Sequence, residues 1–181
     1  MGALKLENLP RYTYKDYTLW DGEWELIDGI IYAMSPSPTE EHQDISKLIA
    51  FELYILLKKC KRCKDILAVD WRIDTKTVVC PDNYVVCSDN FEKRKFNQTT
   101  PSIIFEILSP STRKKDETIK FELYEENGVD YYVMIEQNKK SAKIYKLKNA
   151  KYEFDKKIKN GKYNFKLNEC NIKFNFGNIF E

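Results

Sequence analysis

Two carboxylates set within apolar segments are the residues of this sequence best suited to metal chemistry. Glu106 is surrounded by five large apolar residues in Ile103–Leu108, a run short and β-branched enough to be a strand. Asp82 follows Pro81 inside a second apolar run, Val78–Val86. Two buried carboxylates repel each other unless a cation lies between them. Mg²⁺ suits such a pair, because it is usually held by one or two carboxylates together with water and substrate phosphate.

A simpler interpretation of the same residues stays open. Asp82 would then end its strand in a Pro-Asp turn, and Glu106 would pair with a lysine. Asp116 and Lys120 stand four residues apart in a predicted helix, so they share one helix face. On a helix surface such a pair contributes only about half a kcal/mol. Spacing alone does not distinguish this surface pair from a catalytic group.

The carboxylates require a sheet to position them. Apolar residues at helical spacing predict a helix over 40–59, and a second predicted helix over 112–127 is followed by Gly128, a natural stop. Strands are expected at 66–73, 77–86, 103–108 and 130–136. This order of elements predicts an α/β (α+β) fold in which helices flank a central mixed β-sheet.

Turn signals mark the two ends of the chain. Asp28-Gly29 between apolar runs predicts a hairpin over 26–32. The C-terminal part, with Asn160-Gly161, is expected to form strands and hairpins. No repeat or Pro/Gly/Ser-rich linker divides the 181 residues, so we expect a single domain. Its parts are an N-terminal segment and hairpin (1–39), a core (40–136) and C-terminal strands (137–181).

Composition limits the class of protein without deciding it. Lys and Arg number 30 against 28 Asp and Glu, so any nucleic-acid binding must come from local clustering of charge. No apolar run approaches the length of a membrane span, and the N-terminus lacks the apolar core of a signal peptide. Five cysteines without a secretory signal predict free thiols in the cytoplasm.

Cys60 and Cys63 form a Cys-x-x-Cys pair that also suggests a zinc site. Cys80 and Cys87 would be the two further ligands. These two differ in parity along one predicted strand, so their side chains would face opposite sides of the sheet. We therefore prefer free thiols.

Short motifs along nearly the whole chain form a pattern. They are Trp24–Gly29, Met34–Pro36, His42, Pro81-Asp82, Phe105–Thr112, Asp116, Lys120, Tyr124, Gly128–Tyr132 and Phe176–Phe180. This pattern resembles the Uma-type restriction endonucleases of the PD-(D/E)xK nuclease superfamily. The resemblance implies a restriction-endonuclease-like core and an endonuclease that uses Mg²⁺ (or Mn²⁺) to hydrolyse phosphodiester bonds of DNA. One departure is Leu108, which occupies the position of the superfamily's lysine.

The resemblance also implies roles for individual residues. Asp82 and Glu106 would hold the metal, with the backbone carbonyl of Ile107 as a further ligand. Lys120 would replace the missing lysine and orient or deprotonate the attacking water. Glu25 would be an outer ligand acting through water; a surface acid beside the hairpin is the alternative.

His42 is the one histidine of the chain and lies on the apolar stripe of its predicted helix, so it points inward. A hydrogen-bonded core residue is one interpretation, and the family pattern makes it a candidate for the rim of the active site. Arg113, Lys114 and Lys115 begin the second predicted helix, where the helix dipole disfavours cations. A nucleic-acid phosphate there would compensate; solvated surface residues are the alternative.

Two functions from different classes follow. The first is a Mg²⁺-dependent DNA endonuclease, which the resemblance suggests is a homodimer because restriction-type enzymes cut duplexes by pairing sites. The second is a non-catalytic module that binds nucleic acid or a protein through the C-terminal strands, from Lys143 to Lys166. The buried acids favour the first function. Leu108 and the near-neutral net charge favour the second.

Overall fold

The structure is a computed structural model that describes residues 9–34, 37–89, 91, 95–168 and 170–180. Ser35 and Pro36 of the family pattern lie outside these residues. The strands are β1 (Trp24–Ile27), β2 (Ile30–Ala33), β3 (Cys63–Leu67), β4 (Trp71–Arg72), β5 (Val78–Val79), β6 (Asn83–Cys87), β7 (Ile103–Leu108), β8 (Tyr131–Glu136), β9 (Ser141–Lys148), β10 (Lys151–Ile158), β11 (Lys162–Leu167) and β12 (Cys170–Asn175). The helices are α1 (Tyr14–Tyr17), α2 (Glu40–Leu57), α3 (Arg113–Glu117) and α4 (Ile119–Glu126), with 3₁₀ turns η2 (Gln137–Lys139) and η3 (Phe176–Ile179).

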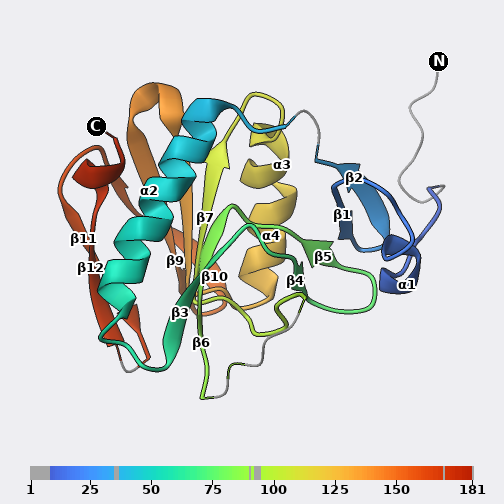
Figure 1. The fold of residues 1–181 in the computed structure, drawn as a ribbon, viewed down its shortest axis with the longest axis horizontal. Coiled ribbons are helices and arrows are strands. Elements are labelled where there is room, and N and C mark those ends of the chain that lie inside the picture. Colours follow the sequence, from blue (N-terminus) through green and yellow to red (C-terminus); the bar gives the residue numbers. More distant parts are fainter. Residues whose placement is uncertain (1–8, 35–36, 90, 92–94, 169, 181) are drawn as a thin grey trace.

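The largest sheet in the described residues has six strands in the order β10-β9-β8-β7-β6-β3. It is mixed, because β7 and β8 run parallel whereas β6 pairs with β7, and β8 with β9, antiparallel. Figure 1 shows the β1–β2 hairpin at one end of the molecule and the β11–β12 hairpin at the other. The predicted mixed sheet with helices and terminal hairpins is confirmed.

Strand β7 separates two apolar clusters. Ile103, Phe105 and Ile107 belong to the cluster that α2 and the β11–β12 hairpin share with one sheet face. Ile104 and Leu108 belong to the cluster that includes Tyr124 of α4 on the other face. Because side chains alternate along a strand, Glu106 is directed to the α4 side together with Ile104 and Leu108.

The Asp28-Gly29 hairpin forms as predicted. Both turn residues have positive φ, 48° at Asp28 and 75° at Gly29, as a two-residue hairpin turn requires. A Cβ on Gly29 would lie 3.1 Å from the carbonyl oxygen of Tyr12, so the turn also needs a residue without a side chain. The hairpin joins β5 through the pairing of Leu26 with Val78.

Two of the predicted strands are each divided between sheets. The predicted strand 66–73 separates at Ala68, which has a φ of 45°, into β3 and β4. The predicted strand 77–86 separates at Pro81, which lacks the N–H that a continuous ladder needs, into β5 and β6. Because β5 lies in the four-stranded sheet and β6 in the six-stranded sheet, Asp82 lies where the chain crosses between them.

The predicted helix over 112–127 is interrupted. It forms α3 and α4, which meet at Thr118 with φ −127° and ψ −80°. The Thr118 hydroxyl donates to the carbonyl of Lys114 at 2.6 Å, a local bond that competes with helix continuation. Gly128, with a φ of 74°, follows the end of α4 as predicted. The first predicted helix forms as α2 and ends two residues before 59.

The prediction that Asn160-Gly161 belongs to a hairpin is wrong. It connects β10 to β11, which lie in different sheets. The hairpin turn between β9 and β10 is Asn149-Ala150, with φ values of 50° and 60°. Asn is among the residues that adopt this conformation most readily.

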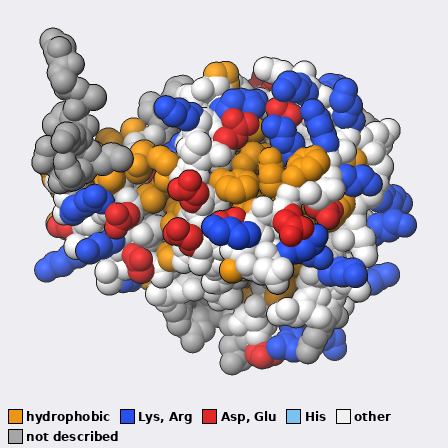
Figure 2. All heavy atoms as spheres, turned by 180° about the vertical axis from the view of Figure 1, so that it is seen from behind, with side chains coloured by type: hydrophobic (Ala, Val, Ile, Leu, Met, Phe, Trp, Pro, Cys, Tyr) orange, Lys and Arg blue, Asp and Glu red, His pale blue; other side chains and the backbone are white. Residues whose placement is uncertain are grey.

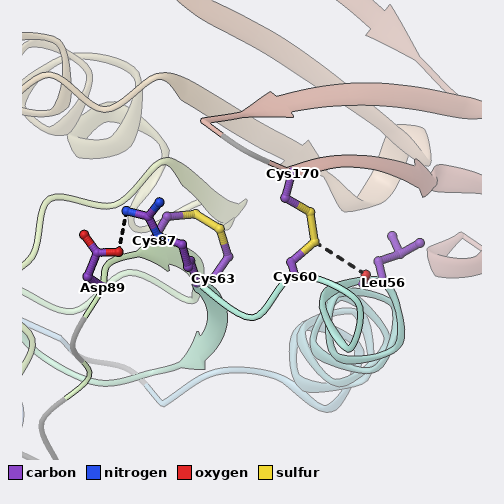
Figure 3. Close-up of a disulfide and its surroundings, with 7 residues drawn as sticks. Leu56, Cys60, Cys63, Cys87, Asp89 and Cys170 are labelled. Atoms are coloured by element: carbon purple, nitrogen blue, oxygen red, sulfur yellow. Dashed lines mark hydrogen bonds and ion pairs between the residues drawn. A yellow bond between two sulfur atoms is a disulfide. The ribbon is translucent and has the colours of Figure 1, made fainter.

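Four cysteines form disulfides, so the expectation of free thiols is wrong for all but Cys80. Cys60 bonds to Cys170, and Cys63 bonds to Cys87, its cross-strand neighbour on β6 (Figure 3). Three of the four cysteines considered for zinc are therefore in disulfides. Because these cysteines are paired, free thiols no longer support a location in the cytoplasm. That location stays a prediction. No helix among the described residues has the length and apolar character to cross a membrane.

Candidate active site

Lys120 is the centre of a buried cluster of charges. Its side chain, on α4, is only 4% exposed. The Nζ atom lies 2.9 Å from Oε1 of Glu106, 2.8 Å from Oε1 of Glu25 and 3.8 Å from Oδ1 of Asp116. The interpretation of Lys120 and Asp116 as a surface pair is therefore wrong. Both side chains are buried, Asp116 on α3 and Lys120 on α4, because the two helices pack on the sheet face that carries Glu106.

Glu106 has two partners from α4. Its Oε1 accepts hydrogen bonds from Lys120 and from the Tyr124 hydroxyl, the latter at 2.7 Å. Tyr124 had entered the sequence pattern without a role, although it follows Lys120 by one helical turn. Burial raises the pKa of Glu106 well above its usual range, and the nearby carboxylates, Asp82 foremost, raise it further against the effect of Lys120. The glutamate that interrupts β7 therefore meets a lysine and a tyrosine.

Lys120 stays charged in this cluster. Burial alone would lower its pKa, but Glu106, Glu25 and Asp116 together hold the pKa well above the usual range. Asp116 is itself held in place, because the Tyr132 hydroxyl of β8 donates to its backbone carbonyl at 3.0 Å. The ammonium is thus a positioned cation. Its raised pKa does not suit it to act as a base.

Glu25 reaches the cluster from β1 and is completely buried. Its Oε1 accepts from the backbone N–H of Cys80 at 3.1 Å as well as from Lys120, and its Oε2 lies 2.5 Å from Nζ of Lys115. Although burial raises its pKa, Lys120 and Lys115 lower it below the usual range. Glu25 is therefore a charged, buried residue, and its interpretation as a surface acid is wrong.

Asp82 lies beside this cluster at the start of β6. Its Oδ2 accepts a hydrogen bond from the backbone N–H of Ile107 at 2.7 Å and lies 3.3 Å from Nε2 of His42. Because Ile107 directly follows Glu106 on β7, this hydrogen bond holds the Asp82 carboxylate against the strand that carries Glu106. The fold thus brings Asp82 next to β7, and a shared metal site of Asp82 and Glu106 stays a prediction.

His42 points inward from α2, as its place on the apolar stripe predicted. Its Nδ1 is buried without a hydrogen-bond partner, so a proton on Nε2 that points at Asp82 satisfies the ring best. Next to it, Ser46 donates to Asn83 at 2.9 Å and fixes α2 against β6. His42 is therefore in direct contact with a candidate metal ligand.

The donor set fits a small divalent cation. Both contacts of Glu106 use Oε1 and both contacts of Asp82 use Oδ2, which leaves a second oxygen on each carboxylate. No group of three or more His, Cys, Asp or Glu in the described part of the chain is arranged to hold a metal. Two carboxylates are sufficient for Mg²⁺, which retains water and binds substrate phosphate.

The position of the superfamily's lysine is apolar here. Leu108 is buried in the cluster on the α4 side of the sheet. The cation comes from α4 instead, where Lys120 extends back toward Glu106.

The three predicted nucleic-acid contacts lie in different surroundings. Lys115 is bound to Glu25, whereas Lys114 is exposed. Arg113 contacts Glu117 at 3.0 Å and Glu136 at 3.4 Å. These three residues are adjacent in the sequence, but they do not form a single cationic surface.

Comparison with known proteins identifies the class of fold. The structure is similar to a crystal structure described as a putative nuclease belonging to DUF820 from Anabaena variabilis, with a TM-score of 0.73 and 16% sequence identity. The similarity covers 93% of this chain and 97% of that one. The two proteins therefore share a fold.

Residues 13–162 match the family Uma2, described as a putative restriction endonuclease. The match spans most of the chain, and this protein belongs to the Uma2 family. A relative from Synechocystis sp., the uncharacterized protein slr1290, is 29% identical over an alignment of 133 residues, and the match covers 69% of this chain and 69% of that one. The resemblance seen in the motifs is confirmed.

Proposed function

We propose that this protein is a metal-dependent endonuclease that hydrolyses phosphodiester bonds of DNA. The observation that carries the proposal is the buried Lys120 ammonium between Glu106 and Glu25, with Asp82 beside them. Burying so many charges together is costly, and strongly shifted pKa values are concentrated at functional sites. Membership of a family described as restriction endonucleases supports the same class.

Asp82 and Glu106 would hold Mg²⁺ or Mn²⁺ through the carboxylate oxygens that the protein does not already use, with the Ile107 carbonyl as a further ligand. When bound, the metal would polarise the scissile phosphate and lower the pKa of a water molecule. The Ile107 N–H and His42 orient the Asp82 carboxylate, and Tyr124 orients Glu106.

Lys120 would act on the phosphate as a fixed positive charge. Because its pKa is raised, it is suited to orienting the attacking water and to offsetting the negative charge that develops in the transition state. Glu25 also holds the ammonium, at 2.8 Å, so the lysine needs little reorganisation. In this proposal the lysine function has moved from the position of Leu108 on β7 to α4.

We further propose that the enzyme is a homodimer, because cutting both strands of a duplex requires two sites. In the C-terminal strands, Phe165 and Phe174 are fully buried and therefore offer no apolar contact surface. The outer side of α2 offers a better apolar surface through Phe51, Tyr54 and Ile55, all of which are exposed. Light scattering at tens of micromolar protein tests this proposal, because a homodimer should have twice the mass of one chain.

Cleavage of supercoiled plasmid DNA tests the function. We expect nicked and linear products with Mg²⁺ or Mn²⁺ and none with a chelator. Asp82→Asn should abolish the products, whereas Lys173→Gln, a change on exposed β12, should not. Intact DNA with each metal would leave the non-catalytic module as the better interpretation.

A further inference from the structure

Four cations surround a single buried carboxylate at the end of β8. The side chain of Glu136 is 1% exposed. The nearest distances from cationic nitrogens to its carboxylate oxygens are 3.0 Å for Lys139, 3.4 Å for Arg113, 3.7 Å for Lys157 and 3.8 Å for Lys143. The cations come from η2, α3, β10 and β9, so the fold gathers them from separate parts of the chain.

The cluster has more positive charge than its own carboxylates neutralise. Glu117 is the second acid in it, 3.0 Å from Arg113 and 3.9 Å from Lys143. Four cations therefore meet two carboxylates, which leaves an excess of two positive charges. Their side chains are 28% to 60% exposed, so the excess faces solvent. Exposed like charges held this close repel one another unless an anion joins them.

The strand register aligns this cluster with the candidate active site. Glu106 on β7 is opposite Met134 on β8, Met134 is opposite Lys143 on β9, and Lys143 is opposite Lys157 on β10. Residues directly opposite in a sheet share a face, so the two lysines lie on the Glu106 face. Neighbouring strands are about 4.8 Å apart, which places Lys143 about 10 Å and Lys157 about 14 Å from Glu106 along the sheet.

Basic side chains gather on one face of the molecule. Figure 2 shows the molecule from behind, with Lys and Arg side chains gathered along one upper edge, above a patch of apolar side chains. Some acidic side chains lie among them. A strongly basic edge of this kind attracts a polyanion even though the whole chain has a net charge of only +2.

We propose that Arg113, Lys139, Lys143 and Lys157, organised around Glu136, bind the phosphate backbone of DNA beside the cleavage site. This proposal rests on the proposed nuclease function and adds the surface that holds the substrate. A row of cations leading away from Glu106 across successive strands fits a backbone whose phosphates repeat regularly. Arg113 was predicted from the sequence as a nucleic-acid contact, and Lys143 and Lys157 lie in the stretch from Lys143 to Lys166 that the alternative function assigned to binding. Lys115 is not part of this surface, because its ammonium is bound to Glu25.

Binding of a fluorescently labelled 20-base-pair duplex, measured by anisotropy without divalent metal, tests the proposal independently of cleavage. We expect the double variant K143Q/K157Q to bind on the order of tenfold or more weakly at 0.1 M salt, because two phosphate contacts are lost. The slope of log K against log salt should fall by about 1.8, since each contact with B-DNA contributes about 0.9.

The matched control is K58Q/K173Q, which removes the same charge from α2 and β12 on the other side of the six-stranded sheet. It should retain the wild-type affinity and slope. Equal affinity and slope for wild type and K143Q/K157Q would overturn the proposal, and so would a wild-type protein that binds no DNA at low salt. Cleavage by an enzyme that fails these tests would leave the nuclease function intact. Cluster-dependent binding without cleavage would support the DNA surface and refute the nuclease.

Discussion

The Nζ atom of Lys120 lies 2.9 Å from Oε1 of Glu106. This ion pair joins helix α4 to the buried strand β7, although fourteen positions of sequence separate the two residues. The same ammonium lies 2.8 Å from Oε1 of Glu25 on β1. Through these two ion pairs, Lys120 links Glu106 of the six-stranded sheet to Glu25 of the four-stranded sheet. Any change to it alters both the proposed catalysis and the stability of the core.

Lys120→Ala should lower the rate of plasmid cleavage by roughly a hundredfold or more, because the transition-state charge loses its cation. It should also destabilise the fold by about 3 kcal/mol, since Glu106 and Glu25 would lose a buried partner. Cleavage is measured well below the melting temperature of the variant. Mn²⁺ binding should persist, and Lys173→Ala at an exposed position of β12 is the control. Wild-type cleavage rates in Lys120→Ala would refute the relocated lysine.

Asp82 should be needed for metal binding and also for stability. Asp82→Ala leaves the Ile107 N–H without its acceptor, and we expect a loss of about 1 to 3 kcal/mol in the metal-free protein. Asp82→Asn retains an acceptor oxygen and should lose less. Calorimetry should find no Mn²⁺ binding in either variant, and normal binding in Asp155→Asn on β10. Unchanged Mn²⁺ affinity in Asp82→Ala would remove the basis for the proposed metal site.

Glu136 should stabilise the protein in a pH-dependent way. Although burial raises its pKa, Lys139, Lys143 and Arg113 lower it from 4.5 to about 2. The unfolded state therefore binds more protons between these values, so the stabilisation is complete above about pH 5 and is lost as the pH falls toward 2. Melting curves should show Glu136→Gln less stable than wild type at pH 7, with the difference vanishing near pH 2. A constant difference across this range would contradict the ion cluster.

The disulfides should account for several kcal/mol of stability. Cys60–Cys170 spans 110 residues and Cys63–Cys87 spans 24. Loop-closure entropy corresponds to about 5 and about 3 kcal/mol for loops of these lengths. Urea unfolding with a reducing agent should therefore show a much lower free energy of unfolding. Thiol titration of the denatured, unreduced protein should detect Cys80 alone; five reactive thiols would show that the disulfides are absent.

The sequence by itself determined the local features of this protein. Asp28-Gly29 specifies its hairpin turn because few other residue pairs tolerate two positive φ angles. The apolar stripe of α2 placed His42 inward. The apolar residues around Glu106 showed that this carboxylate is buried and on which sheet face it lies. Each of these conclusions depends on neighbours within about one helical turn or one strand.

Only the tertiary structure decided which distant residues meet. Glu25 contacts Lys115 and Lys120 because the β1–β2 hairpin packs beside α3 and α4, and no spacing in the sequence encodes that contact. Cys170 and Cys60 are separated by 110 residues, and they too meet only through the packing of distant elements. The partners of Glu136 come from four elements, of which the sheet register aligns only β9 and β10. Charge pairing and disulfide formation act through space, so they become visible only when the sheets have placed these side chains together.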